Sequence, residues 1–258
     1  IIIDAMDKTK FAWPRYPFRQ QPKDLAELVR PRLTFTCAMA HGYCVDLYMA
    51  TEQINHGASA FNEILCRTIT NVKKICRERG LPFPQHLVVQ SDNTVSQAKN
   101  QHACLFLATL VARRYFRTVN LCFLTVGHTH EDIDQLFGVI VSLILSIGSF
   151  QTPSELMEYL LEKLRPKFAA KQELVTGTML TAVRDFKTWL KPLNRTLWHA
   201  FANRQQKEAP HAFTFKQGRE LSHAEKMWFG EEVSRRLGVE DIYCCVKTYM
   251  HSRTLQQE

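Results

Sequence analysis

Short apolar runs alternate with segments of helical periodicity along the first 148 residues. Single strands are predicted at residues 1–7, 85–93 and 117–126, and residues 32–50 predict two strands joined around a His-Gly turn. Helices are predicted at residues 59–80, 95–116 and 130–146, where apolar side chains recur at helical spacing. Three strands followed by alternating helices and strands predict an α/β fold with a mixed five-stranded sheet flanked by helices.

The length and composition are those of a globular protein. The 258 residues are 45% hydrophobic and 22% charged, enough for one large core or two modest ones. We expect a catalytic core in residues 1–150 and a mostly helical C-terminal extension, residues 151–258, packed on that core, in which "HAFTFKQG" is the one candidate strand. The apolar run "LFGVIVSLILSIG" has 13 residues. Spanning a bilayer takes about 20, so this run predicts a buried helix and no membrane partner.

The net charge and the cysteines indicate the kind of partner and the cellular compartment. The formal net charge is +8 and the pI about 9.1, which favours a polyanionic partner. The excess of Lys and Arg is four in residues 1–150 and four in residues 151–258, so no basic tail accounts for it. Eight cysteines without a Cys-x-x-Cys pair indicate reduced core thiols of an intracellular protein. The opening "IIID" does not fit a signal peptide and begins in mid-strand, as expected of a domain cut from a longer chain.

Acidic residues gather where predicted strands end. They are Asp4 and Asp7 on the first strand, Asp92 after the fourth, and Glu131, Asp132 and Asp134 after the fifth. Ligand sites of open α/β sheets lie beyond the carboxyl ends of strands. Carboxylates brought together there repel one another, and a divalent cation removes the repulsion. The pattern predicts a site for Mg²⁺ or Mn²⁺, and two such ions about 4 Å apart can cleave a phosphodiester.

Three motifs carry a family resemblance: "DAMDKTKFAWPR", "QSDNTVSQAKNQ" and "GHTHEDIDQLFGVI". Together with the order of elements, they resemble the ribonuclease H-like superfamily of transposases and retroviral integrases. A closer resemblance is to an uncharacterised, transposon-associated, integrase-like domain of eukaryotic genomes. The resemblance covers about residues 1–150 and implies a ribonuclease H-like fold with a metal-binding acidic triad. Asp4, Asp92 and Asp134 match the triad, the last through Gly-His, five residues, Asp, two residues, Phe-Gly.

Simpler interpretations stay open for several of these residues. Asp92 could cap the following helix, and Asp7 could be a solvated turn residue. Glu131 and Asp132 suit the first turn of a helix, where negative charge is favourable, and both remain alternatives for the third acid.

His128 and His130 precede this helix, and His130 and Asp134 are four residues apart. Two histidines at such spacing leave a zinc-dependent hydrolase as an alternative. His128 could instead orient an acid or contact a phosphate beside the metal ions.

Nucleic-acid contacts are predicted in two places. Arg15, Arg19 and Lys23 lie in a basic, aromatic loop, and Asn93 and Lys99 flank Asp92. The tryptophans of such stretches serve more often as core anchors. The expected partner is DNA, or an RNA–DNA hybrid, and a second copy of the chain is a further candidate.

The sequence thus predicts metal-dependent phosphodiester cleavage or strand transfer on DNA, by the catalytic domain of a nuclear transposase or integrase-like protein. The alternative from another class is a domesticated, inactive domain that binds nucleic acid or protein.

Overall fold

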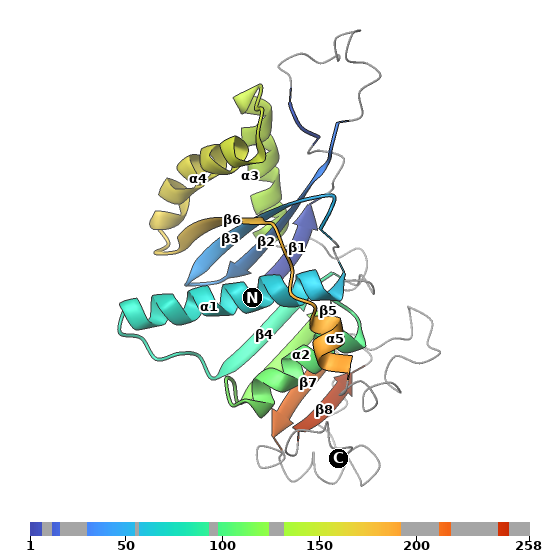
Figure 1. Ribbon diagram of the computed structural model, residues 1–258. Helices are drawn as coiled ribbons and strands as arrows, with labels where there is room; N and C mark the ends of the chain where they lie inside the picture. Colours follow the sequence, from blue (N-terminus) through green and yellow to red (C-terminus); the bar gives the residue numbers. More distant parts are fainter. Residues whose placement is uncertain are drawn as a thin grey trace.

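The computed structural model describes residues 1–6, 12–15, 30–54, 57–92, 98–123, 132–191, 212–217 and 242–247 (Figure 1). The strands are β1 (Ile2–Met6), β2 (Leu33–Ala40), β3 (Cys44–Thr51), β4 (His86–Ser91), β5 (Thr118–Phe123), β6 (Leu174–Leu180), β7 (Ala212–Gln217) and β8 (Ile242–Lys247). The helices are α1 (Ala58–Glu78), α2 (Gln101–Ala112), α3 (Asp132–Ile147), α4 (Pro153–Ala169) and α5 (Phe186–Leu190). The first eight elements follow the predicted order, which confirms the mixed α/β class.

The strands form one mixed sheet in the order β6-β3-β2-β1-β4-β5-β7-β8. The prediction of five strands was therefore too low by three. All three additional strands come from the C-terminal part of the chain. β6 pairs parallel to β3 at one edge, while β7 and β8 extend the sheet beyond β5 at the other. "HAFTFKQG" does contain a strand, β7, and the described residues of 151–258 form the helices α4 and α5 together with the strands β6, β7 and β8.

β1 lies where the direction of chain progression reverses. It pairs antiparallel to β2 on one side and parallel to β4 on the other, and β4 pairs parallel to β5. After β1 the chain adds β2 and β3 on one side of it, and then adds β4 and β5 on the other side. In open α/β sheets such a reversal point is where ligand sites form.

Helices cover the two faces of the sheet differently (Figure 1). On one face α1, α2 and α5 enclose a core that runs from β3 to β7. On the other, α3 and α4 pack on β1, β2, β3 and β6. Because β2 and β3 are covered on both faces, all eight residues of β2 and seven of the eight of β3 are buried. The sequences of these two strands are therefore mostly apolar along their whole length, without the alternation of a half-exposed strand.

Helix ends agree with local chemistry. Gly80 follows α1 in a left-handed conformation, φ 65°, which glycine adopts without a steric penalty. α2 begins six residues later than residue 95, its predicted start, because Asn100 caps it. The Asn100 Oδ1 accepts hydrogen bonds from the backbone N–H groups of His102 and Ala103 at 3.0 and 3.1 Å.

Two further predictions concern the cysteines and the apolar run. The six cysteines whose side chains are described are all free thiols. Four are buried, Cys37, Cys44, Cys76 and Cys104, and two are partly buried, Cys66 and Cys122. The run "LFGVIVSLILSIG" lies in α3 and the residue after it, and α3 packs against the sheet, as predicted. Within the described ranges, no helix combines the length and the apolar character needed to cross a membrane.

Candidate functional site

Asp4 and Asp92 lie side by side in neighbouring strands. β1 and β4 pair in parallel register with Ile2 opposite Gln90 and Ile3 opposite Ser91. Continued by one residue, this register sets Asp92 level with Asp4. Adjacent strands are about 4.8 Å apart. Two acids 88 residues apart in the sequence therefore occupy neighbouring positions of this extended register, next to the reversal point of the sheet.

The face on which Asp4 lies follows from strand alternation. Ile3 packs into the core under α1 and α2, whereas Met6 packs into the core under α3 and α4. Asp4 has the parity of Met6, so its half-buried side chain lies on the α3 side. Cys37 pairs with Asp4 across β1 and β2. Burial, and after it the negative charges of Asp4 and Asp46, raise the pKa of the Cys37 thiol.

Asp92 does not cap the next helix. That role belongs to Asn100, eight residues later. Asp92 is exposed directly after the last residue of β4. The simplest structural explanation of this acid is thereby removed, which strengthens the case for a chemical role.

The acids of α3 are arranged differently from the prediction. Asp132 and Asp134 both lie in the first turn of α3 and both are exposed. The Asp132 carboxylate is 3.7 Å from the Nε2 of His41, a residue of the β2–β3 turn. The start of α3 is therefore next to that turn, and the structure does not show Asp134 joining Asp4 and Asp92.

Helical geometry places Asp134 on one face with Phe137 and Gly138, which predicts that Phe137 packs on the sheet and that Gly138 allows a close approach of the helix. Phe137 is buried against the sheet, as predicted. Gly138 is exposed, and a Cβ added there would have no neighbour within 4 Å. The predicted close approach of the helix at Gly138 is wrong because the buried stripe runs through Ile133, Leu136, Phe137 and Ile140, and Gly138 lies beside it.

Two of the three predicted metal-binding acids, Asp4 and Asp92, lie at neighbouring strand positions. Among the residues that the structure describes, no three His, Cys, Asp or Glu side chains converge closely enough to hold an ion. Seven candidate residues lie outside the described ranges: Asp7, Arg19, Lys23, Asn93, His128, His130 and Glu131. Asp4 and Asp92 alone supply the paired carboxylates that Mg²⁺ or Mn²⁺ accepts together with water and phosphate oxygens. The third acid stays a prediction.

The predicted nucleic-acid contacts are only partly described. Lys99 is 1% exposed, and its Nζ lies 5.4 Å from the centre of the Phe123 ring. Burial lowers the pKa of this lysine. Lys99 is therefore not presented to a phosphate backbone at the surface, because the apolar end of β5 encloses it. The backbone of Arg15 bonds to that of Phe150 at 2.8 and 3.2 Å, and Arg19 and Lys23 lie outside the described residues.

A buried carboxylate was missed in the sequence. Asp46, in the middle of β3, is fully buried. It accepts hydrogen bonds from Thr176 Oγ1 at 2.6 Å, Asn71 Nδ2 at 3.1 Å and Tyr48 Oη at 3.4 Å. Burial raises the pKa of this carboxyl, although its hydrogen bonds act in the opposite direction. An acid inside the apolar run "CVDLYMA" was the available signal. This network joins β3, α1 and β6 and has a structural role.

A second buried acid ties the C-terminal region to α1. Glu63 is held by Arg67 and Arg184, each at 2.7 Å from Nε to a carboxylate oxygen. Burial would raise the pKa of Glu63, but the hydrogen bonds from Arg184 and Arg67 outweigh it and the net shift is downward. Arg184 precedes α5, so this pair fixes the segment after β6 on the helical layer.

The fold and the site define a mixed α/β domain with two acids at the reversal point of its sheet. The chain belongs to the DUF7869 family, described as a domain of unknown function, whose model matches residues 23–230. Asp92 and Asp134 fall inside the matched range and Asp4 precedes it. Comparison with curated proteins found no match, and comparison with solved structures found none either.

Proposed function

We propose that this domain carries out metal-dependent phosphodiester cleavage or strand transfer on DNA, as the catalytic domain of a nuclear transposase or integrase-like protein with a ribonuclease H-like fold. The observation that carries the proposal is the register of β1 and β4, which sets Asp92 level with Asp4 at the reversal point of the sheet. The observed order of the first eight elements supports it as well.

Asp4 and Asp92 would share a Mg²⁺ or Mn²⁺ ion, and Asp134 from α3 would complete the set. The bound ion supplies Lewis-acid stabilisation of the phosphate and lowers the pKa of an attacking water. Asp4 is half-buried in a strand that pairs on both sides, so its position is well fixed. Asp92 is exposed beyond β4, where a substrate can reach it. The chain thus offers one rigid carboxylate and one accessible carboxylate to the same ion.

A nuclease assay on labelled DNA with Mn²⁺ tests the proposal. Asp92→Asn should abolish cleavage and change the thermal melting point little, because the side chain is exposed and the amide keeps its shape. Glu158→Gln is the matched control, since Glu158 is an exposed acid of α4 on another part of the molecule. Cleavage by Asp92→Asn at the rate of the parent would refute the assignment.

Metal binding gives an independent measurement. Without substrate we expect weak binding, so that Mn²⁺ raises the melting point by mass action only at high concentration. Asp4→Asn should remove this stabilisation. A melting point that does not respond to Mn²⁺ would argue against the site, and stabilisation by Zn²⁺ alone would favour the zinc hydrolase.

The arrangement of α3 favours a second candidate, a domesticated domain that binds nucleic acid or protein without catalysis. Asp132 pairs with His41, and Asp4, Asp92 and Asp134 do not form a metal-holding group among the described residues. This candidate predicts DNA binding that is independent of divalent metal and unchanged by Asp92→Asn. Cleavage abolished by Asp92→Asn would exclude it.

A further inference from the structure

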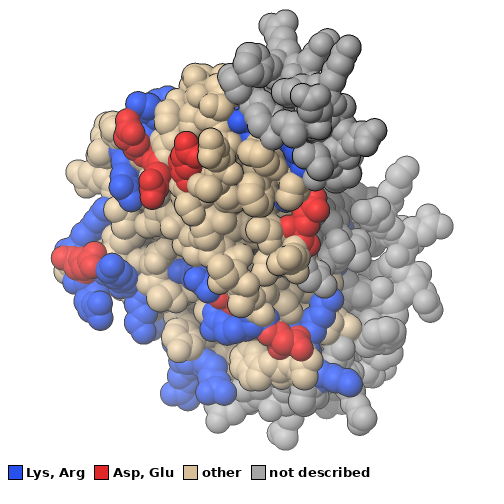
Figure 2. Space-filling model, turned by 45° about the horizontal axis from the view of Figure 1, so that its top comes forward, with Lys and Arg blue, Asp and Glu red and all other residues tan. Residues whose placement is uncertain are grey.

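Positive charge is concentrated at one end of the sheet, although it is spread evenly between the two halves of the sequence. Residues 70–90 and 110–120 contain seven Lys or Arg against one Glu, a formal charge of +6 in a chain whose total is +8. All seven cations are exposed: Lys73, Lys74, Arg77, Arg79, Arg113, Arg114 and Arg117. We call this set the amino-end basic surface. Figure 2 shows Lys and Arg gathered along the left and lower left edges of the molecule.

The cations of this surface come from two chain segments. The last turns of α1 and the residue that caps it supply four of them, and the segment between α2 and β5 supplies three. The backbone N–H of Arg117 bonds to the carbonyl of Gln85 at 2.7 Å, which holds the starts of β4 and β5 together. β4 has six residues at about 3.3 Å each. The surface thus lies about 20 Å from Asp92, at the opposite ends of the parallel strands.

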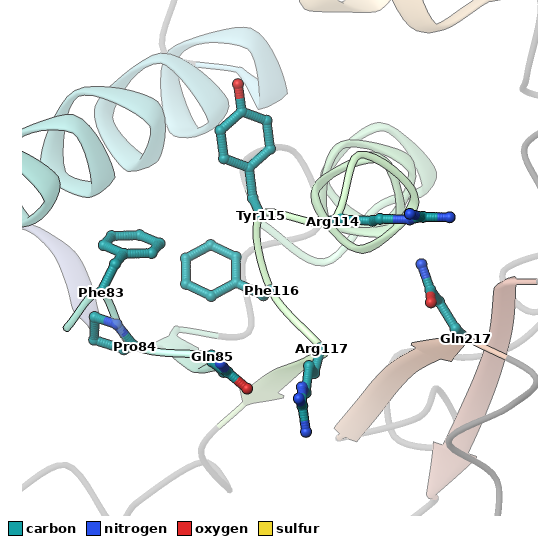
Figure 3. Close-up of a pocket in the computed structure, with 8 residues that line it drawn as sticks. All are labelled: Phe83, Pro84, Gln85, Arg114, Tyr115, Phe116, Arg117 and Gln217. Atoms are coloured by element: carbon teal, nitrogen blue, oxygen red, sulfur yellow. The ribbon is translucent and has the colours of Figure 1, made fainter.

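A pocket of about 320 Å³ opens within this surface (Figure 3). The side chains of Arg114 and Gln217 extend toward each other across it, and Arg117 and Gln85 line its lower side. Within the described part of the chain, neither guanidinium forms an ion pair. The volume of the pocket is at the lower end of the range for small-ligand sites. The described lining of the pocket therefore offers two arginines and two amides and contains no acidic side chain.

Aromatic rings complete the pocket. Phe83 and Phe116 lie against each other with centroids 5.3 Å apart. Tyr115 is 51% exposed, and the Nζ of Lys73 lies 5.8 Å from the centre of its ring. Exposed rings among cations provide stacking surfaces for nucleobases next to phosphate-binding groups.

The backbone at Arg114 fixes where its side chain leaves the end of α2. Arg114 has φ 59° and follows α2 at the position where helices usually place glycine. Its N–H bonds to the carbonyl of Val111, and the N–H of Tyr115 to that of Leu110, each at 2.9 Å. A long side chain in this conformation carries a steric cost that glycine would avoid.

We propose that the amino-end basic surface binds single-stranded nucleic acid, with phosphates on Arg113, Arg114 and Arg117 and a base stacked on Tyr115 at the mouth of the pocket. Stacking favours a single strand over a duplex, because the bases of a duplex are already stacked on one another. The surface goes beyond the proposed cleavage site, lies at the other end of the sheet, and does not depend on the candidate acids being catalytic.

Binding of a labelled oligothymidylate, followed by fluorescence anisotropy in EDTA at several salt concentrations, tests this proposal. Each single-strand phosphate contact contributes about 0.7 to the slope of log K against log salt. Arg113→Gln with Arg117→Gln should therefore reduce that slope by about 1.4. The control is Lys163→Gln with Lys167→Gln, which removes two exposed cations of α4 and should leave the slope unchanged.

A glycine pair separates binding from folding. Arg114→Gly should weaken oligothymidylate binding without lowering the thermal melting point, because glycine suits the backbone there. Gln172, φ 58°, stands in the same conformation after α4. Gln172→Gly makes the same backbone change, removes no charge, and should leave binding as it is.

Tyr115→Ala should weaken binding of oligothymidylate but not of inorganic polyphosphate, which has no bases. Four outcomes would overturn the proposal: an unchanged slope in the Arg113/Arg117 variant, equal affinity for duplex and single strand, equal loss of polyphosphate binding in Tyr115→Ala, or binding to phosphatidylserine vesicles in place of the oligonucleotide. Because EDTA excludes metal-dependent cleavage, none of these results depends on the fate of the Asp92 assay.

Discussion

Arg114 ends α2 in the backbone conformation with which Gly80 ends α1, at φ values of 59° and 65°. The hydrogen bonds are also alike. The N–H of Tyr115 bonds to the carbonyl of Leu110 at 2.9 Å, and the N–H of Leu81 to that of Cys76 at 2.8 Å. Both helices thus stop by the same motif at the same end of the sheet, one with glycine and one with arginine.

Substitutions at these two positions should change the stability of the fold in opposite directions. Gly80→Ala should lower the free energy of unfolding by about 1 kcal/mol, because a Cβ is disfavoured at φ 65°. Arg114→Gly should raise it by zero to about 1 kcal/mol, since relief of the left-handed backbone is offset by the greater freedom of glycine in the unfolded chain. Urea unfolding midpoints with unchanged m-values would measure both. A clear loss of stability in Arg114→Gly would show that its side chain stabilises the fold.

Asp46 should make the fold less stable as the pH rises. Burial raises the pKa of its carboxyl above the unfolded value. The folded state therefore holds the proton more tightly, and the free energy of unfolding should fall as the pH rises from the unfolded pKa through the raised folded one. The difference between the parent and Asp46→Asn isolates this contribution from the other acids. If the two profiles run parallel through that range, the pKa of Asp46 is not raised.

The link between Glu63 and Arg184 should hold the segment before α5 on α1. Arg184→Gln should lower the free energy of unfolding by about 1–2 kcal/mol, because it removes one charge-assisted hydrogen bond while Arg67 still partners Glu63. Since the pKa of Glu63 is lowered in the fold, its stabilising contribution is present above the unfolded pKa and is lost as the pH falls through the folded one.

Hydrogen exchange of residues 181–191 checks where this effect acts. Protection should fall in that segment before it falls in β2 or β3. An Arg184→Gln variant in which exchange rises equally everywhere would contradict a local role for this link.

The identity of the third acid can be decided by two amide variants. If Asp134 completes the metal site, Asp134→Asn should abolish Mn²⁺-dependent cleavage and Asp132→Asn should leave it nearly intact. Asp132→Asn should cost less than about 0.5 kcal/mol of stability, because Asp132 and His41 are both largely exposed. Single-turnover cleavage and a melting curve on each variant give the answer. The reverse pattern would assign the role to Asp132.

How much the sequence predicted depended on the range of the interactions. The order of the first eight elements followed from local periodicity, and Gly80 marked the end of α1 because its conformation is a local requirement. The position of Asp92 relative to Asp4 depends on strand pairing across 88 residues, which no local pattern determines; the rule about strand ends supplied only the expectation that they approach. Asp134 was harder to place, because the segment between β5 and α3 decides where that helix begins relative to the sheet.

The missed features have a common cause. β6 contains Gly177 and three polar or exposed positions, so its sequence resembled a loop between helices. It is a strand because it pairs along all seven of its residues with β3. A Cβ at Gly177 would collide with the Met157 side chain on α4, so a larger residue there would require that side chain to move. The amino-end basic surface was missed because its cations come from two segments that are adjacent only after folding.

Both edges of the five-stranded part of the sheet are closed by chain that is synthesised much later. β3 ends at Thr51, and its edge partner β6 begins only at Leu174. β5 ends at Phe123, and its edge partner β7 begins only at Ala212. During synthesis the first 150 residues therefore present two unpaired edges, which are prone to pair with other chains. We expect the domain to reach its native state only after most of it has left the ribosome, and a fragment that stops at residue 150 to aggregate.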